Sequence, residues 1–208
     1  MSECAIPEEI LDRAVSILER GGLVAFPTES WYGLAADPLN NRALDRLYSV
    51  KRRPADKPIL VLVDSMHQLD LLAERIPEPY PLLMERFWPG PLTLIFPANS
   101  GLPGPLTAGS GTIAIRCPSN GTALALIGKF GRPVTGTSAN ISAMQPHNTA
   151  PGVAASLGQQ IDMILDGGAT AGRKGSTIIA CREKGLVCVR EGQVPFADVQ
   201  AVVNQSIG

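Results

Sequence analysis

Apolar residues recur along the chain at two spacings, one typical of helices and one typical of strands. Positions three or four apart predict a helix that follows Pro7 and ends at Gly21-Gly22, with an apolar face of Ile10, Ala14, Ile17 and Leu18. The same spacing predicts a helix that begins at Asn40 or Asn41 and buries Leu44, Leu47 and Tyr48. Short, uninterrupted apolar runs predict strands at residues 23–26, 59–63, 92–96, 112–116, 133–136 and 163–165.

The remaining stretches complete an alternating pattern. Helices are expected from Ser65 to Leu72, before Phe87-Trp88, and near residues 122–130, 151–157 and 196–203. Residues 177–180 and 187–190 predict a hairpin, and residues 28–33 and the Gly/Pro/Ser-rich 99–111 predict loops, the second of them mobile. Because helices and strands alternate first and the hairpin comes late, we expect one α/β domain over residues 1–208. It should contain a twisted, open, mixed and largely parallel sheet with helices on its faces.

Composition narrows the classes of function. The 18 Lys and Arg residues and 19 Asp and Glu residues nearly cancel, so no global field gathers nucleic acid or membrane. No apolar run approaches the roughly 18 residues of a membrane span, and the acidic N-terminus does not resemble a signal peptide. We therefore expect a cytoplasmic protein with no membrane partner. The two histidines lie far apart in sequence, which argues against a His-rich zinc site.

The cysteines predict no disulfide framework. Cys4, Cys117, Cys181 and Cys188 show no C-x-x-C spacing, and we expect them to be reduced thiols buried as small apolar groups. Cys181 and Cys188 could face each other across the predicted hairpin.

A dense group of cations follows the second predicted helix. The segment 51–57 reads Lys-Arg-Arg-Pro-Ala-Asp-Lys, with four cations and one acid. Cations at a helix C-terminus interact with the helix dipole, worth roughly 0.3–1 kcal/mol each, but four of them exceed that need. Arginine offers a planar fork to phosphate and lysine a point charge. The segment therefore predicts an anion site that binds the phosphates of a nucleotide.

Polar residues also stand at the ends of several predicted strands. Residues 137–140, Thr-Ser-Ala-Asn, suit a phosphate or oxyanion, although an ordinary turn would look the same. Residues 175–177, Gly-Ser-Thr, are equally ambiguous, and Arg116 and Arg190 end apolar strands at what would be the rim of a sheet. Two familiar nucleotide motifs fail: residues 109–114 precede a strand, and residues 167–172 lack the Lys-Ser/Thr pair of a P-loop.

Taken in order, these segments resemble a known family. Residues 27–34 (PTESWYGL) and 51–58 (KRRPADKP) match two of its signatures. Four more motifs follow in the family order, at residues 87–93, 113–118, 137–140 and 176–178. From about residue 8 to 195 the chain is similar to the YrdC-type family, in the short form of the threonylcarbamoyl-AMP synthases (the TsaC kind). The resemblance implies a YrdC-like fold with a concave basic cleft.

The resemblance also implies a reaction and its partners. L-threonine and bicarbonate form N-carboxythreonine, whose oxygen attacks the α-phosphate of ATP and releases pyrophosphate. The product, threonylcarbamoyl-AMP, would pass to a threonylcarbamoyl transferase complex that modifies adenosine 37 of tRNA. Mg2+ is expected to accompany ATP, with metal ligands that the sequence does not name.

Residue by residue, the resemblance assigns two groups of side chains. The ATP-binding positions are Lys51, Arg53, Lys57, Thr112, Ser138, Asn140 and Arg190, with Lys51 and Arg53 expected to be catalytic. The threonine-binding positions are Ser30, Arg116 and Ser176. Arg52 is expected to be a solvated surface cation.

Two residues depart from the family pattern. Leu62 stands where many relatives carry histidine, and Ala143 replaces a glycine after the S-A-N-x-S motif. If that position needs a positive φ, Ala143 costs roughly 1 kcal/mol or shifts the loop.

Three alternatives to the synthase stay open at this point. They are a paralogue with the same fold and another activity, a module whose basic cleft binds RNA weakly, and a carbamoyl-handling domain of a larger enzyme. Near-zero net charge and few aromatic residues argue against the RNA module.

Overall fold

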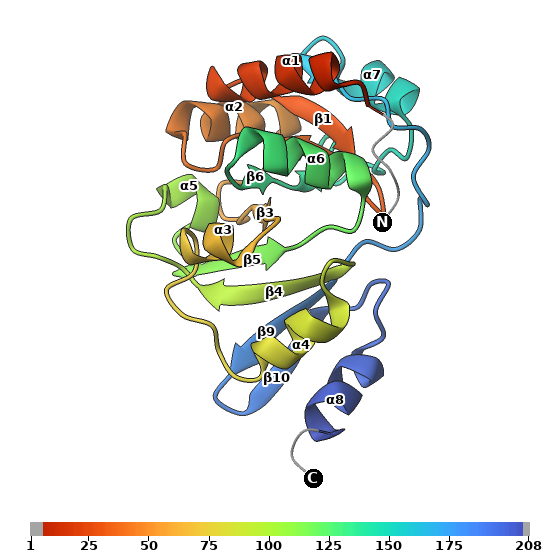
Figure 1. The fold of residues 1–208 in the computed structure, drawn as a ribbon. Coiled ribbons are helices and arrows are strands. Elements are labelled where there is room, and N and C mark those ends of the chain that lie inside the picture. The colour runs from red at the N-terminus through yellow and green to blue at the C-terminus, as the bar shows by residue number, and fades with distance from the viewer. Residues whose placement is uncertain (1–5, 206–208) are drawn as a thin grey trace.

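The computed structural model describes residues 6–205, and these residues form helices packed around two sheets (Figure 1). The helices are α1 Glu8–Glu19, α2 Asn41–Lys51, α3 Met66–Asp70, α4 Tyr80–Phe87, α5 Gly104–Thr107, α6 Gly121–Phe130, α7 Ala150–Leu157 and α8 Phe196–Gln205. The strands are β1 Val24–Pro27, β2 Tyr32–Ala35, β3 Leu60–Leu62, β4 Leu92–Pro97, β5 Thr112–Arg116, β6 Val134–Thr135, β7 Thr137–Ser138, β8 Met163–Ile164, β9 Thr177–Arg182 and β10 Gly185–Arg190.

Side-chain caps begin several of the helices where the sequence predicts them. The Asn40 side chain accepts a hydrogen bond from the backbone of α2, and Ser65 does the same for α3. Asn120 caps α6, which ends at Gly131 in the left-handed conformation. The first helix differs in its buried face, because Leu11 is buried with Ala14 and Leu18, whereas Ile10 and Ile17 are only half-buried.

The strands form two sheets, not one. A four-stranded sheet has the order β7-β2-β1-β8, and a six-stranded sheet has the order β10-β9-β4-β5-β3-β6. Three strand pairs are parallel (β1 with β8, β3 with β5, β4 with β9), and the other five pairs among the described residues are antiparallel. The α/β class and the mixed sheet are confirmed. The expectation of one largely parallel sheet is wrong, because two predicted loop regions contain short antiparallel strands.

The two sheets meet at a seam around Gly136. The chain leaves the six-stranded sheet at Thr135 and enters the four-stranded sheet at Thr137, with only Gly136 between them. The Thr135 hydroxyl donates to Leu34 O at 2.8 Å and accepts from Ala36 N at 2.8 Å, which ties the seam to β2. A Cβ on residue 136 would lie 2.5 Å from the Leu62 side chain, so the seam requires glycine there.

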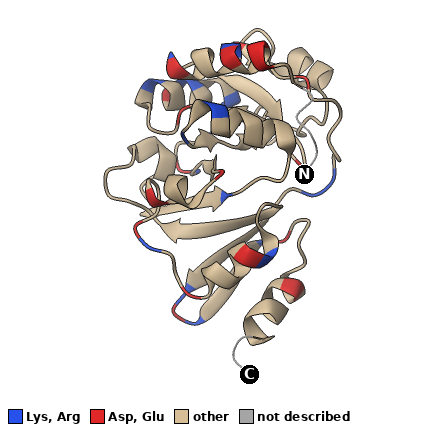
Figure 2. Cartoon of the chain, viewed as in Figure 1, with Lys and Arg blue, Asp and Glu red and all other residues tan. Residues whose placement is uncertain are grey.

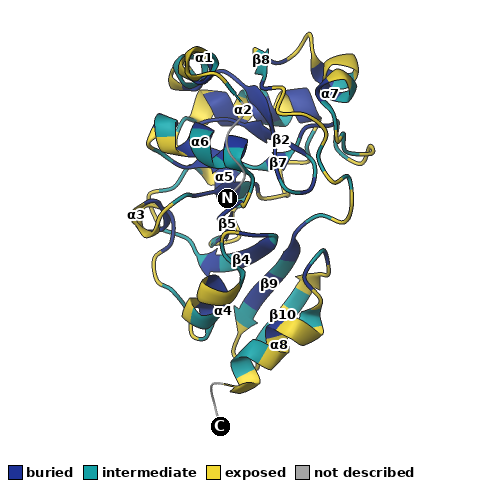
Figure 3. Ribbon diagram, turned by 45° about the vertical axis from the view of Figure 1, so that its right-hand side comes forward, coloured by how far each residue is buried: buried dark blue, intermediate teal, exposed yellow. Residues whose placement is uncertain are grey.

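Two apolar cores hold the helices on the sheets. In the smaller core, α1 and α6 pack against β1, and Leu62 is buried there. The larger core extends through the rest of the chain (Figure 3). Helices α4 and α8 lie on one face of β9 and β10, where Leu186 and Cys188 face the core (Figure 1). The opposite face of β10 is open, because Val187 and Val189 are 45% and 54% exposed.

Several smaller expectations are now settled. Residues 28–33 are only partly a loop, because β2 begins at Tyr32, and residues 99–111 contain the short helix α5. Cys181 does not lie opposite Cys188, because the hairpin register pairs Cys181 with Leu186 and Cys188 with Ile179. Cys117, Cys181 and Cys188 are free thiols, and Cys4 lies outside the described residues. No helix within residues 6–205 is both long and apolar enough to span a membrane.

Candidate active site

A cavity of about 620 Å3 is lined by strands of both sheets, and we call it the inter-sheet cavity. Its wall on the four-stranded sheet includes Ser30 and Ser138, and its wall on the six-stranded sheet includes Arg116, Ser176 and Arg190. Arg53 also lines it, from the segment after α2. Six of the ten predicted site residues therefore surround one space, although they are far apart in sequence.

Arg116 is the most deeply buried cation of this cavity. It ends β5, is 2% exposed, and forms an ion pair with the carboxylate of Glu29. Its Nε makes no hydrogen bond to any described residue. Burial, together with the positive charge of Arg190, lowers the pKa of Arg116 to about 10. A buried guanidinium with an unused donor is suited to binding a carboxylate.

Ser30 is held from behind by the segment that joins the two sheets. Its carbonyl accepts from Gly172 N at 2.9 Å and from the Thr170 hydroxyl at 3.0 Å. Its own hydroxyl lies 3.3 Å from the Thr28 hydroxyl. These contacts fix the backbone of residue 30 and leave its side chain at the cavity wall.

Ser176 and Arg190 form the other side of the cavity. The Ser176 hydroxyl lies 2.8 Å from the Thr93 hydroxyl, and Arg190 Nη2 donates to Ser176 O at 2.8 Å. Burial lowers the pKa of Arg190. Thr93 is the second residue of β4 and Ser176 directly precedes β9, so the parallel pairing of Leu92 with Thr177 brings their hydroxyls close together.

The four cations of residues 51–57 differ in burial. Lys51 is 1% exposed, and its Nζ donates to Asn140 O at 2.8 Å, to Asn140 Oδ1 at 3.3 Å and to Ser138 O. Burial and the charge of Arg53 lower the pKa of Lys51 to about 7. Arg53 donates to Lys57 O at 3.0 Å and to Pro58 O at 2.7 Å.

The other two cations of this segment point to solvent. Arg52 is exposed and has a φ of 48° at the C-terminus of α2. Lys57 is exposed and does not line the inter-sheet cavity, so its contact with ATP stays a prediction.

Ser138 and Asn140 share a compact hydrogen-bond network. Ser138 Oγ donates to Asn140 Oδ1 at 2.6 Å, and Asn140 Nδ2 donates to Met144 O at 2.6 Å. Asn140 is 5% exposed and lies behind Ser138, which alone of the two lines the cavity. Ala143, the residue directly before Met144, has a φ of 68°. The condition under which alanine is costly at this position, a positive φ, is therefore met.

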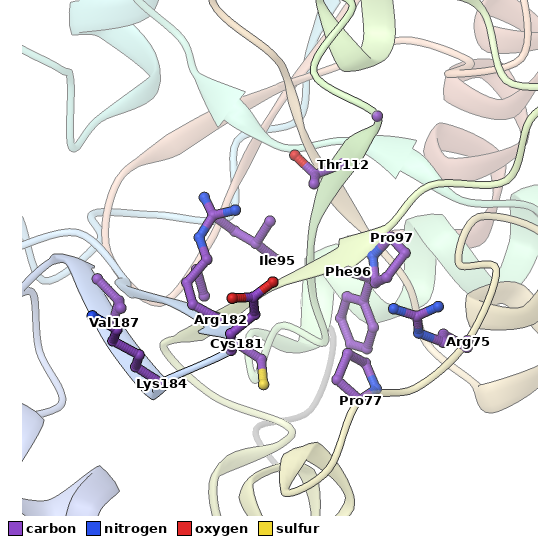
Figure 4. A pocket seen from close by; sticks show the side chains of 13 residues that line it. Arg75, Pro77, Ile95, Phe96, Pro97, Thr112, Cys181, Arg182, Lys184 and Val187 are labelled. Atoms are coloured by element: carbon purple, nitrogen blue, oxygen red, sulfur yellow. The ribbon is translucent and has the colours of Figure 1, made fainter.

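Thr112 lies away from the other predicted residues, in a second cavity of about 810 Å3 that we call the outer cavity (Figure 4). Arg75, Arg182 and Lys184 also line it. The two cavities occupy one open face of the six-stranded sheet: Ile95 lines both, and the cross-strand pairs Ile95–Ala114 and Pro97–Thr112 continue from one to the other. Thr112 therefore stands two residues along β5 from the inter-sheet cavity.

The charged residues around the inter-sheet cavity and the possible metal ligands of the described residues set limits on the site. Figure 2 shows both signs of charge on α1, on α2 and at the β9–β10 turn. The inter-sheet cavity itself is lined by Arg53, Arg116, Lys174 and Arg190 and by one carboxylate, Glu191. The expected basic cleft stays a prediction. Within residues 6–205, no group of three or more His, Cys, Asp or Glu residues could hold a metal ion.

Comparison with known proteins now places the chain. The sequence model of the Sua5/YciO/YrdC family, described as telomere recombination, matches residues 16–192. The chain belongs to the Sua5/YciO/YrdC family. The resemblance of the motifs to a YrdC-type protein is thereby confirmed.

Relatives of this Sua5/YciO/YrdC chain include proteins named threonylcarbamoyl-AMP synthase. Those of Pyrococcus abyssi and Bacillus subtilis are each 40% identical over 192 residues, or 92% of this chain. The crystal structure of P. abyssi Sua5 complexed with L-threonine matches 93% of this chain and 57% of its own, with a TM-score of 0.89 and 40% identity. The chain spans 56% of the length of the two curated relatives.

Sequence reasoning missed several residues that the family fold brings to the site. Glu29 pairs with Arg116, Thr93 contacts Ser176, and Lys174 lines the inter-sheet cavity. Glu29 and Thr93 stand inside motifs already noted, so their presence there was the available signal. Lys174 belongs to a coil between strands and carries no pattern of its own.

Proposed function

We propose that the chain is an L-threonylcarbamoyladenylate synthase, which condenses L-threonine, bicarbonate and ATP to threonylcarbamoyl-AMP and pyrophosphate. The observation that carries this proposal is Arg116, a buried cation that lines the inter-sheet cavity and whose Nε has no hydrogen-bond partner among the described residues. Glu29 already pairs with this guanidinium, and a ligand carboxylate would add a second anionic partner. The names of the relatives and the threonine complex of P. abyssi Sua5 support threonine as that ligand.

Threonine would bridge the two walls of the cavity. Arg116 would pair with its carboxylate, sharing the guanidinium with Glu29. Ser30 and Ser176 would hydrogen-bond its remaining polar groups from opposite sheets. Held in this way, the amino nitrogen would bond to the carbon of bicarbonate with release of water, giving a carbamate. A carbamate oxygen would then attack the α-phosphate of ATP and displace pyrophosphate.

ATP would occupy the neighbouring part of the same cavity. Arg53, Ser138 and Arg190 line it. The family resemblance adds Lys57 and Thr112 as nucleotide positions at its edge, and Lys51 and Asn140 as buried residues behind Ser138. Displacement at the α-phosphate needs positioning and charge neutralisation more than covalent catalysis. The two arginines would neutralise the triphosphate and the leaving pyrophosphate.

Mg2+ fits this proposal as part of the ATP complex. The described residues offer no cluster of ligands for a metal on its own, and Mg2+ is commonly bound through substrate phosphates with one or two carboxylates. Glu191 is the carboxylate that lines the cavity. The bound ion would add positive charge to the phosphates.

The product would leave for a second enzyme. A threonylcarbamoyl transferase complex would move the group to adenosine 37 of tRNA, which places the chain in tRNA modification in the cytoplasm. The chain itself needs no strong RNA affinity for this role.

The decisive experiment measures pyrophosphate release from ATP and identifies the adenylate product by mass spectrometry. We expect release to require threonine and bicarbonate together. Arg116→Met, assayed at a temperature at which circular dichroism shows it folded, should lose the threonine-dependent release, whereas the exposed control variant Arg13→Met should behave as wild type. Release that is indifferent to threonine would reject the proposal. No turnover, combined with RNA binding that weakens steeply with salt, would instead favour an RNA-binding module.

A further inference from the structure

Lys51 has no donor left for a substrate. Its side chain is buried at the end of α2, and its Nζ contacts three oxygens, Ser138 O, Asn140 O and Asn140 Oδ1. Burial lowers the pKa of Lys51, but three acceptor oxygens around Nζ favour its charged form. The ammonium has three N–H donors and no acceptor, so these three oxygens use all of them. A direct bond to a phosphate would require one of these contacts to break.

The ammonium also decides how the neighbouring side chains are oriented. Because Lys51 only donates, the Asn140 atom that faces it must be the acceptor Oδ1. The other end of the amide, Nδ2, then donates to Met144 O at 2.6 Å. Ser138 Oγ lies 2.6 Å from the same Oδ1 and must donate to it. The Ser138 hydroxyl proton therefore points to Asn140, and its lone pairs stay available at the cavity wall.

A second contact ties the same two segments together through the backbone. Ser142 N donates to Lys51 O at 2.8 Å. Lys51 thus holds residues 138–142 by its carbonyl and by its ammonium, across 87 positions of sequence between Lys51 and Ser138. The end of α2 and the Ser138–Asn140 network form one unit.

We propose that Lys51 is a positioning residue whose buried ammonium fixes the direction of the Ser138–Asn140 network, so that Ser138 accepts a hydrogen bond from a donor of the nucleotide, such as a ribose hydroxyl, and not from its phosphates, which have no donor to offer. This inference rests on the proposed synthase function and names the part that Lys51 plays in it. The competing outcome is that Lys51 contacts ATP directly, as the family resemblance implies.

A double-mutant cycle separates the two outcomes. The variants are Lys51→Met, Asn140→Ala and their combination, and the measured quantity is kcat/KM for ATP at saturating threonine. Losing a charged hydrogen bond should cost each single variant roughly ten- to a hundredfold. If Lys51 acts through Asn140, the double variant should stay within about threefold of the worse single variant, with KM for threonine unchanged. Losses that multiply, or an unimpaired Lys51→Met enzyme, would overturn the proposal.

Amide hydrogen exchange supplies a readout that needs no turnover. Lys51→Met should raise exchange in residues 138–144, whereas Arg52→Met, which removes the exposed neighbouring cation, should leave it unchanged. Unchanged exchange in Lys51→Met would contradict the positioning role. If wild-type enzyme shows no threonine-dependent turnover, the synthase proposal fails, but the exchange result still decides the role of Lys51.

If Lys51→Met does not fold, Asn140→Asp offers a second test of the same network. Aspartate keeps acceptors for Lys51 and Ser138, but it adds a negative charge and replaces the donor to Met144 O with a second acceptor. We expect Asn140→Asp to retain more kcat/KM for ATP than Asn140→Ala. Equal losses in the two variants would count against the network as the reason for the effect.

Discussion

Ala143→Gly should stabilise the protein, and the gain in unfolding free energy can be worked out from the backbone conformation of residue 143. Ala143 has a φ of 68° and an exposed side chain, so glycine removes strain without removing packing. An L-residue in the left-handed region costs about 1–2 kcal/mol, and the extra freedom of an unfolded glycine offsets about 0.5–1 kcal/mol. The net gain is about 0–1.5 kcal/mol, and its central value of about 0.75 kcal/mol corresponds to about 1.5–3 °C in Tm for a chain of this size.

The measurement is thermal and urea unfolding of Ala143→Gly beside a control of opposite sign. Ala155 is exposed within α7, where glycine should cost about 1 kcal/mol. We expect the midpoint of Ala143→Gly to rise and that of Ala155→Gly to fall. If both variants lose stability by similar amounts, the positive φ of residue 143 stores no strain and the reasoning is refuted.

Three further predictions concern the site. Arg53→Ala should lower ATP-linked stabilisation by about 1.5–3 kcal/mol, measured by calorimetry with ATP, and unchanged affinity and turnover would remove Arg53 from the site. Arg116→Met should destabilise the fold by about 3–5 kcal/mol because Glu29 loses its partner, and adding Glu29→Met should restore part of this in urea unfolding; a double variant as unstable as the single one would contradict the pairing. Burial and the charge of Asp166 raise the pKa of Tyr32 to about 12, above its usual 10. The free energy of unfolding should therefore fall as pH rises from 10 to 12, because the unfolded state loses the Tyr32 proton first. Tyr32→Phe should make this fall less steep, and an identical slope would exclude Tyr32 as its source.

Much of the fold was predictable because its helices carry local signals. The caps at Asn40, Ser65 and Asn120 and the apolar spacing of α2 specify those helices without tertiary contacts. Strands β2 and β7 were missed because they are short and contain Gly33, Thr137 and Ser138, which look like turn residues. Their pairing comes from the tertiary seam, and this is also why two sheets form where one was expected.

The candidate site was also predictable in some respects and not in others. Motifs identified most of the residue types that line the inter-sheet cavity, because most of these motifs stand at strand ends that the two sheets bring together, and the segment after α2 adds Arg53. Depth could be predicted in part. Helical spacing from Leu44 puts Lys51 on the apolar face of α2, and the expected exposure of Arg52 is confirmed. No local pattern shows that Lys51 meets the Ser138–Asn140 segment, since this contact depends on tertiary packing. The position of Thr112 in the outer cavity depends on the open sheet face, which no local pattern encodes.

The seam at Gly136 has a consequence for how the two substrates affect each other. Ser30 and Ser138 belong to one side of the seam, and Arg116, Ser176 and Arg190 belong to the other. Each proposed substrate would therefore act as a cross-link between the sheets. Whichever binds first would supply the ordering of the sheets that the second also needs, so ATP and threonine should bind with positive cooperativity, equal in both directions.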